Sequence, residues 1–377
     1  EIQSGANRDA ALKILHDDVY DKHMHPFWAQ TDEVEHDEVR GLLAARKAEP
    51  YVWKYSDIGP LLERASELIT TGDSDRRSLV MVNPGLAPKR ATVSTMYSSY
   101  RLNGVDEIMP PHKHSASACR FGLKGSGNFT GVEGENIVFG PGDLILTPND
   151  ARHNHGSVGG EGALNVSILD FPLVETLHAL EFSFDYTEME NGKEVEKKVQ
   201  SDRYPSDYSQ ITYGQGGMMP RFADHNRAGG FASPQVVYRW EAMESILDAH
   251  MDHEGDPHEG IVIDYTNPRS GGPVFETINF YIQMLRPGEK TLPNRETASV
   301  ILTPFEGKGH SIIDGERFDW SECDTVAVPG GCWAEHVNGS STERAIIFGS
   351  TDAPTQQKLK LYKRWGRNQA GDLLRFE

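Results

Sequence analysis

The first eighty residues carry a helical pattern of apolar positions. The clearest stretch is residues 56–72, SDIGPLLERASELITTG, in which leucines and isoleucines recur at helical spacing. A polar Ser-Asp pair ahead of such a run is typical of a helix start, and a glycine after it is typical of a helix end. The pattern predicts a helix that begins at Ser56-Asp57 and ends at Gly72.

The pattern changes at residue 76. From RRSLVMVNPGL to about residue 172, short β-rich runs alternate with glycine turns, as in VEGENIVFGPGDLILTP. A second block of the same character runs from about residue 260 to 352. Short strands at regular intervals with turn residues between them predict an antiparallel sandwich or barrel in each block.

The segment between the two blocks is different. Residues 185–230 are polar and rich in glycine, and EMENGKEVEKKV predicts an exposed hairpin that turns at Asn191-Gly192. Further on, YRWEAMESILDAHM predicts a connecting helix.

The two β-rich blocks resemble each other closely enough to be copies. A glycine follows His114 after eleven residues in the first block, and a glycine follows Glu296 after eleven residues in the second. GENIVFGPGDLILTP then aligns without a gap with GERFDWSECDTVAVP. An internal repeat of this length predicts an all-β core of two tandem jelly-roll barrels. We expect a helical N-terminal segment at 1–80, a first barrel at 81–180, a linker with a hairpin and a helix at 181–259, and a second barrel at 260–377.

The amino-acid composition limits the classes of molecule that the protein can bind. The 377 residues carry a formal net charge of −19, which argues against nucleic acid and anionic membranes because both attract basic surfaces. No apolar run approaches the length of a membrane span, and the first residues show no secretion signal. Three cysteines are too few for a disulfide framework. We therefore expect a soluble cytoplasmic protein, in which an anionic substrate needs an arginine of its own.

Two pairs of histidines in the first block predict a metal site. Residues two apart on a strand point to the same face, so His112 and His114 face the same way, together with Arg120. After the Asn149-Asp150 turn, His153 and His155 again share a face. If that face is the barrel interior, several imidazoles and one arginine meet there.

These residues resemble the motifs of the cupin superfamily. The second cupin motif places a glycine, a proline and a histidine at the spacing of Gly142, Pro148 and His153, with Asp150 in place of its second glycine. The first cupin motif has a glutamate after its two histidines, and Ala118 and Cys119 stand there instead. The resemblance implies a site of three histidines, His112, His114 and His153, without a protein carboxylate.

Three neutral imidazoles suit Fe, Zn, Cu or Ni and leave positions open for other ligands, whereas Mn prefers oxygen. The remaining histidines have plainer interpretations. His23 and His25 lie outside the repeat, beside a proline, and are interpreted as structural. The stretch HMDHEGDPHEG, residues 250–260, is interpreted as an acidic surface loop.

The second block has lost the histidine set. Asn294 and Glu296 replace the first two ligands, Ala334 replaces the third, and His336 remains as the counterpart of His155. We expect no comparable site there, although Glu296, His336 and His310 leave a weak one open. The expected role of the second barrel is to pack on the first and to build the oligomer.

A longer resemblance covers most of the chain. The sequence resembles the bicupin aromatic ring-cleaving dioxygenases, which include gentisate, salicylate and 1-hydroxy-2-naphthoate dioxygenases. The resemblance depends on the degenerate second barrel and on these segments: RRSLVMVNPGL, PPHKHSASACRF, LKGSG, PGDLILTP, RHNHG, ILDFPLV and YTNPRSGGP.

The family implies roles for particular residues. His112, His114 and His153 would bind Fe(II), which the substrate's carboxylate and adjacent hydroxyl would chelate. Arg120 matches an arginine that contacts substrate or oxygen, and His155 matches a histidine that hydrogen-bonds the ring hydroxyl or dioxygen as an acid or base. The alternative for Arg120 is a buried structural ion pair. Arg76 matches a further substrate-binding arginine, and its alternative is a surface residue ahead of a strand.

The resulting expectation is an Fe(II)-dependent dioxygenase that cleaves gentisate to maleylpyruvate, with a homotetramer as the family's usual assembly. Arg101 replaces a glutamine and Ser167 replaces an aspartate that many relatives carry, so salicylate, a substituted salicylate or 1-hydroxy-2-naphthoate are alternative substrates. A cupin decarboxylase or isomerase that uses Mn or Zn is a rival enzyme. A non-enzymatic bicupin storage or binding protein is the rival from another class.

Overall fold

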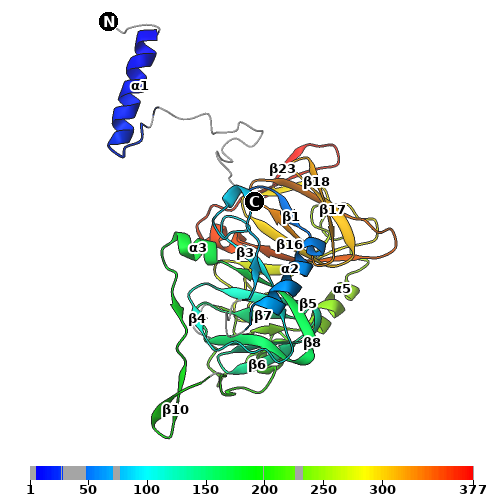
Figure 1. Ribbon diagram of the computed structural model, residues 1–377. Helices are drawn as coiled ribbons and strands as arrows, with labels where there is room; N and C mark the ends of the chain where they lie inside the picture. The colour runs from blue at the N-terminus through cyan, green and yellow to red at the C-terminus, as the bar shows by residue number, and fades with distance from the viewer. Residues whose placement is uncertain are drawn as a thin grey trace. The chain divides into compact units, whose positions relative to one another are not determined.

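The computed structural model describes residues 6–26, 28, 48–70, 77–197, 199–225 and 232–376. The chain divides into two units, Glu1–Arg46 and Lys47–Glu377. The described residues of the first unit form the helix α1 (Ala6–Asp21), and the second unit contains the β-rich part of the chain (Figure 1). An all-β core with a helical N-terminal segment is therefore confirmed.

The first barrel, cyan to green in Figure 1, is built on one seven-stranded sheet. Its strand order is β12-β7-β5-β8-β3-β2, with β6 paired to β5. The bounds are β2 (Leu79–Val80), β3 (Tyr97–Asn103), β5 (Ala118–Val132), β6 (Glu135–Phe139), β7 (Leu144–Thr147), β8 (His153–Leu169) and β12 (Val237–Tyr238). A small ladder of β4 (Lys113–His114) and β9 (Phe182–Ser183) lies beside it.

The two longest strands of this barrel, β5 and β8, pair with each other and bend together along their length. Their register shifts between Gly122 and Lys124 and again between Ser126 and Asn128. Gly125, between the two shifts, has a φ of +75°, and a Cβ there would lie 2.2 Å from a backbone carbonyl oxygen. A side chain would therefore be both strained and blocked, so glycine permits the bend.

The second barrel, yellow to red in Figure 1 except for one blue strand from the N-terminal part of the chain, has two six-stranded sheets. The first contains β1 (Tyr51–Trp53), β13 (Ile261–Asp264), β14 (Asn279–Leu285), β16 (Val300–Glu306), β19 (Thr325–Val328) and β21 (Ala345–Thr351). The second contains β15 (Asn294–Glu296), β17 (Lys308–Ile313), β18 (Glu316–Ser321), β20 (Trp333–Asn338), β22 (Arg364–Arg367) and β23 (Leu373–Phe376).

Short helices and one hairpin complete the described part of the chain. The helices are α2 (Tyr55–Leu68), α3 (Phe171–Thr176), α4 (Tyr208–Tyr213), α5 (Trp240–Ala249), α6 (Ala353–Lys358) and a 3₁₀ turn at Pro84–Leu86. The hairpin of β10 (Thr187–Glu190) and β11 (Lys193–Glu196) turns at Asn191-Gly192, where both residues have positive φ, as its sequence predicts. None of the described helices is long and apolar enough to cross a membrane.

The limits predicted for the helix in the N-terminal segment are wrong at both ends. α2 begins at Tyr55 and ends at Leu68, so Ser56 and Asp57 lie within its first turn. The residue before the helix is Lys54, which makes no side-chain cap. Instead the Tyr55 N–H donates to Asp324 of the second barrel at 2.8 Å. A distant carboxylate therefore satisfies the helix start that the local Ser-Asp pair was expected to satisfy.

Each barrel takes an edge strand from the segment that precedes the other barrel. β1, from the N-terminal part of the chain, pairs with β19 of the second barrel. β12, from the linker, pairs with β7 of the first barrel. The apolar interior is also shared, since the rings of Phe121 and Phe348 stack with centroids 4.2 Å apart. The segments that precede the two barrels therefore extend the sheets of the opposite barrel and tie the two halves together.

Two buried aspartates mark the repeat within this shared region. Asp170 accepts a hydrogen bond from a backbone N–H 53 residues earlier in its own barrel and another from the hydroxyl of Thr277 in the other half. Asp352 has the same two contacts, with a backbone N–H again 53 residues earlier and with Thr95. Burial raises the pKa of each carboxyl to about 6, against the opposing effect of these hydrogen bonds.

This raised pKa predicts how the Asp170→Asn variant behaves. The pKa of this carboxyl is higher in the folded than in the unfolded protein. The folded protein therefore loses stability as the pH rises through the folded pKa, because the carboxyl must then ionise while buried. A rise from 3.8 to about 6 corresponds to about 3 kcal/mol that is lost as the pH rises between these values. Asparagine does not ionise, so it has no such dependence. We therefore expect the urea midpoint of Asp170→Asn, relative to that of wild type, to be higher at pH 7 than at pH 4. A pH-independent difference from wild type would contradict the raised pKa.

Candidate metal centre

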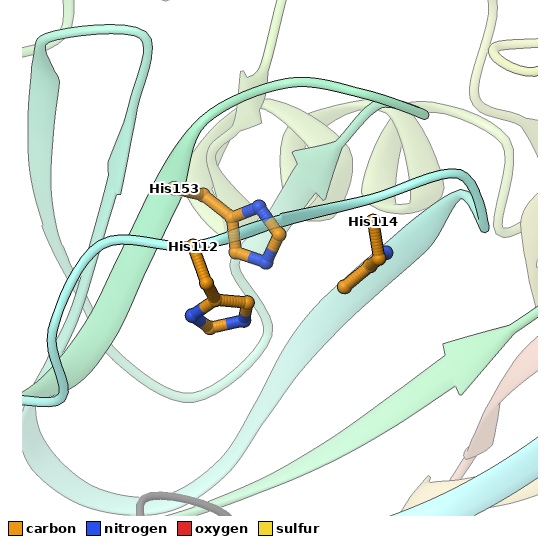
Figure 2. Close-up of side chains that lie close together, drawn as sticks. All are labelled: His112, His114 and His153. Carbon is orange, nitrogen blue, oxygen red and sulfur yellow. The ribbon is translucent and has the colours of Figure 1, made fainter. Parts of the chain in front are cut away.

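Three histidines of the first barrel converge on one point. His112 forms an isolated antiparallel bridge with His153, with both backbone N–H···O distances at 2.9 Å, and His114 belongs to β4. One ring nitrogen from each of the three lies within 4.8 Å of the others, and all three side chains are buried. Figure 2 shows the three rings turned toward a common space. Among the described residues, this is the group of three histidine, cysteine or acidic side chains whose possible metal-binding atoms lie this close together.

Backbone hydrogen bonds orient the three rings. Each Nδ1 lies near a carbonyl oxygen two residues away along the chain, at 3.2 Å for His112, 2.7 Å for His114 and 2.8 Å for His153. Because a carbonyl oxygen only accepts, each Nδ1 carries the ring proton and leaves Nε2 as the lone-pair donor. Metal-binding histidines are typically held in this way.

The residues fit a metal ion on two further observations. The Nε2 atom of His153 is fully buried and has no hydrogen-bond partner among the described residues, which is costly for a polar atom. Burial, and then the neighbouring His112 and His114, lower the pKa of His153 well below its usual value. The ring is therefore neutral, as a metal ligand must be.

The strand expected to carry both ligands and Arg120 is not continuous, and that prediction is wrong. β4 covers only Lys113–His114, the chain bends, and β5 begins at Ala118. Side-chain alternation therefore cannot be counted through the bend, and Cys119 packs into the main apolar core. The hydrogen bonds between His112 and His153, rather than alternation alone, align the two ligand segments.

His155 lies beside this cluster and contacts a residue that the sequence did not pair with it. Its ring centroid is 5.3 Å from that of His112, and its Nδ1 is 2.8 Å from a guanidinium nitrogen of Arg101. Arginine only donates, so Nδ1 accepts and the proton of the neutral ring is on Nε2. Burial, then Arg101 and Arg120, lower the pKa of His155 well below its usual value. His155 therefore presents an N–H donor.

The sequence around Arg101 gives one indication of a site residue, because Arg101 is the one charged residue in the strand YSSYRLN. Its contact with His155 depends on the register in which β3 pairs with β8, with Arg101 opposite Asn165. Sequence reasoning noted the residue as a departure from the relatives and could not assign its partner.

Arg120 is buried in β5 with 7 % of its surface exposed. Its nearest polar partner is the Thr147 hydroxyl at 3.5 Å, and its Nε atom has no hydrogen-bond partner among the described residues. Burial lowers its pKa to about 10, so it remains charged near neutral pH. No carboxylate in the described part of the chain forms an ion pair with it, which argues against the alternative of a structural ion pair.

The other sequence predictions have different outcomes. Arg76 lies outside the described residues, and the adjacent Arg77 is buried in an ion pair with Glu107. Ser167 is buried opposite Arg120 in the β5–β8 ladder. The prediction that residues 250–260 form an acidic surface loop is wrong in part. His258 is only 4 % exposed, and its ring nitrogen lies 3.1 Å from a backbone carbonyl oxygen.

The ligand positions of the second barrel predict the metal content of the protein. Asn294 pairs with Ala334 across β15 and β20, so neither of the paired positions there supplies an imidazole. We expect about one tightly held metal ion per chain, because three nitrogen ligands are present once. Elemental analysis after extensive dialysis measures this ratio, and two equally retained ions per chain would contradict it.

Comparison with known proteins places these features in a family. Residues 104–169 match the Cupin domain model. The chain is 32% identical to 5-aminosalicylate 1,2-dioxygenase from Comamonas sp., over 93% of this chain and 89% of the relative. It is 28% identical to gentisate 1,2-dioxygenase from Streptomyces sp., over 93% of this chain and 94% of the relative.

A solved structure shares the whole architecture. Salicylate 1,2-dioxygenase from Pseudoaminobacter salicylatoxidans, in its adducts with gentisate, superimposes with a TM-score of 0.82 at 26% identity. The match covers 98% of this chain and 96% of that chain. The similarity therefore extends through both barrels.

Proposed function

Because the chain belongs to the cupin-fold aromatic ring-cleaving dioxygenases, and is an enzyme of this type, we propose that it cleaves gentisate to maleylpyruvate with Fe(II). The observation that carries the proposal is the cluster of His112, His114 and His153, whose ring nitrogens lie within 4.8 Å of one another. Their orientation by backbone carbonyls leaves three Nε2 atoms to hold the ion.

Two buried arginines support an anionic substrate at this cluster. Gentisate carries a carboxylate, and the net charge of −19 disfavours its approach to most of the protein. Arg120 and Arg101 both lie close enough to influence the pKa of His155 beside the histidine cluster. In a closed site the guanidinium of Arg120 offers the carboxylate a fixed charge and paired donors.

The remaining groups have distinct tasks. His155 donates its Nε2–H to a ring hydroxyl or a reacting oxygen, since Arg101 occupies its Nδ1. In the resting enzyme this N–H donor is the acid form of the acid-or-base role expected for His155. When bound, iron(II) supplies open coordination positions and the electron transfer that lets an aromatic ring react with O₂. Both oxygen atoms enter the product as the bond between the carboxyl-bearing and hydroxyl-bearing carbons breaks.

A substituted salicylate is the second candidate. Arg101 contacts His155 and Ser167 lies opposite Arg120, so both departures from the relatives' usual residues border the site. The 32% identity to a dioxygenase of 5-aminosalicylate also supports a 5-substituted salicylate. The added positive charge of Arg101 favours a substrate with an electron-rich or anionic group near that edge of the ring.

The setting of the enzyme is also a proposal. The three buried free cysteines suit the reducing cytoplasm, and the family's usual homotetramer is the proposed assembly. We retain Arg76 as a proposed substrate-binding residue, on the family match alone.

Oxygen uptake by iron-reconstituted protein tests the proposed reaction. We expect one O₂ consumed per ring opened with gentisate, and lower kcat/KM with salicylate, 5-aminosalicylate and 1-hydroxy-2-naphthoate. A higher kcat/KM with 5-aminosalicylate would favour the second candidate. Loss of carboxylate as CO₂ without O₂ uptake would instead show a cupin decarboxylase.

A further inference from the structure

The second barrel contains a cavity at the place that corresponds to the histidine cluster of the first. The cavity has a volume of about 40 Å³ and widens into an open mouth, which brings the unfilled space to about 510 Å³. Asn294, Glu296 and Ala334, which replace the three histidines, all line it. The substitutions that remove the metal ligands have therefore left a small open cavity at this place rather than filling it.

The polar groups of this cavity are arranged by contacts behind them, beginning with His336. Trp320 donates its indole N–H to the Ser311 hydroxyl oxygen at 3.1 Å, and that oxygen lies 2.8 Å from Nδ1 of His336. Since the indole only donates, the serine proton is directed at Nδ1. Burial lowers the pKa of His336 to about 4, so its ring is neutral with the proton on Nε2. The ring has no further hydrogen-bond partner among the described residues.

Glu296 supplies an acceptor in the same space. One of its carboxyl oxygens accepts a hydrogen bond from the Tyr362 hydroxyl at 2.9 Å, and the side chain lines the cavity. Burial raises the pKa of this carboxyl to about 7, which shows how little water stabilises its charge. A hydroxyl donor placed against its other oxygen would satisfy it.

The cation near the cavity is already engaged. Arg364 forms an ion pair with Glu259 at 3.1 Å, and its Nε donates to the Asn294 side-chain oxygen at 3.1 Å. An anionic ligand in this cavity would be repelled by Glu296 and Glu259, because the guanidinium of Arg364 is already paired with Glu259. This cavity therefore differs from the first barrel, where Arg120 has no carboxylate partner among the described residues.

From the cavity, its neutral donor His336 and its acceptor Glu296, we propose that the second barrel binds a small uncharged phenol. The hydroxyl of the phenol donates to Glu296 and accepts from Nε2–H of His336. The ring lies against the apolar wall, to which Val300 and Val328 contribute. The site is independent of the ring-cleaving reaction proposed for the first barrel.

Fluorine NMR of the full-length metal-loaded protein tests this site with 4-fluorophenol as the probe. We expect saturable binding by wild type, with affinity at least tenfold weaker for fluorobenzene, which lacks the hydroxyl, and for 4-fluorobenzoate, which is charged. Glu296→Gln should weaken 4-fluorophenol about tenfold, because a charge-assisted hydrogen bond is lost. Ala334→Leu should abolish binding by filling the cavity.

The controls separate this site from the first barrel. His153→Ala, which alters only the histidine cluster, should bind the probe as wild type does, and Glu296→Gln should retain wild-type metal content and melting temperature. If Ala334→Leu fails to fold, Glu296→Gln with its tenfold loss still decides the question. The proposal is overturned if wild type does not bind 4-fluorophenol, if fluorobenzene or 4-fluorobenzoate binds equally well, or if Glu296→Gln leaves the affinity unchanged.

Discussion

His112→Ala is expected to abolish both metal retention and ring cleavage while the protein remains folded. The substitution removes one of three nitrogen ligands that lie within 4.8 Å of one another. Two imidazoles without a protein carboxylate hold a divalent ion far less tightly than three, and a metal-dependent reaction then stops. His112 is a polar residue and not one of the hydrophobic side chains that form the apolar cores, so we expect the truncated barrel to remain folded.

Metal content by elemental analysis and turnover by O₂ uptake measure the two losses on the same sample. Lys113→Ala is the matched control, because it truncates the residue next to His112 in the chain, which is not part of the histidine cluster. It should retain wild-type metal content and activity. Full turnover in His112→Ala would show that the histidine cluster is not the catalytic site.

Arg120→Ala is expected to lower kcat/KM by two to three decades at unchanged metal content. Arg120 is 7 % exposed and has no carboxylate partner among the described residues, which leaves its guanidinium available for the proposed anionic substrate. Losing a charge-assisted hydrogen bond in a closed site costs about 2–4 kcal/mol of transition-state stabilisation. The substrate carboxylate would then be desolvated without compensation.

Steady-state kinetics with gentisate and with 5-aminosalicylate measure this effect. Arg120→Lys should recover only part of it, since an ammonium does not reproduce the planar pair of donors. Lys124→Ala serves as the control, because it removes a positive charge from an exposed position of the same strand. Wild-type kcat/KM in Arg120→Ala would return the residue to a structural role.

The sequence by itself determined the fold class and the candidate metal ligands, because both depend on short-range patterns. The spacing of Gly142, Pro148 and His153 is that of a turn followed by a strand, so it can be recognised from a short stretch of sequence. The Asn191-Gly192 pair predicts its hairpin because both residues adopt positive φ at low cost. The repeat between the two blocks predicted two barrels, and it also showed which ligand positions the second had lost.

Only the tertiary structure decided which distant groups meet. The Tyr55 N–H is satisfied by Asp324 and His155 by Arg101, pairings that depend on strand register and on how the barrels pack. The same dependence explains the wrong expectation for His258, an apparently acidic-loop residue that is buried against the second barrel. Local sequence sets what each segment prefers, but the free energy of burying a polar group depends on partners far along the chain. For that reason the histidine cluster could be predicted from sequence, whereas the contact of His155 with Arg101 and the cavity of the second barrel could not.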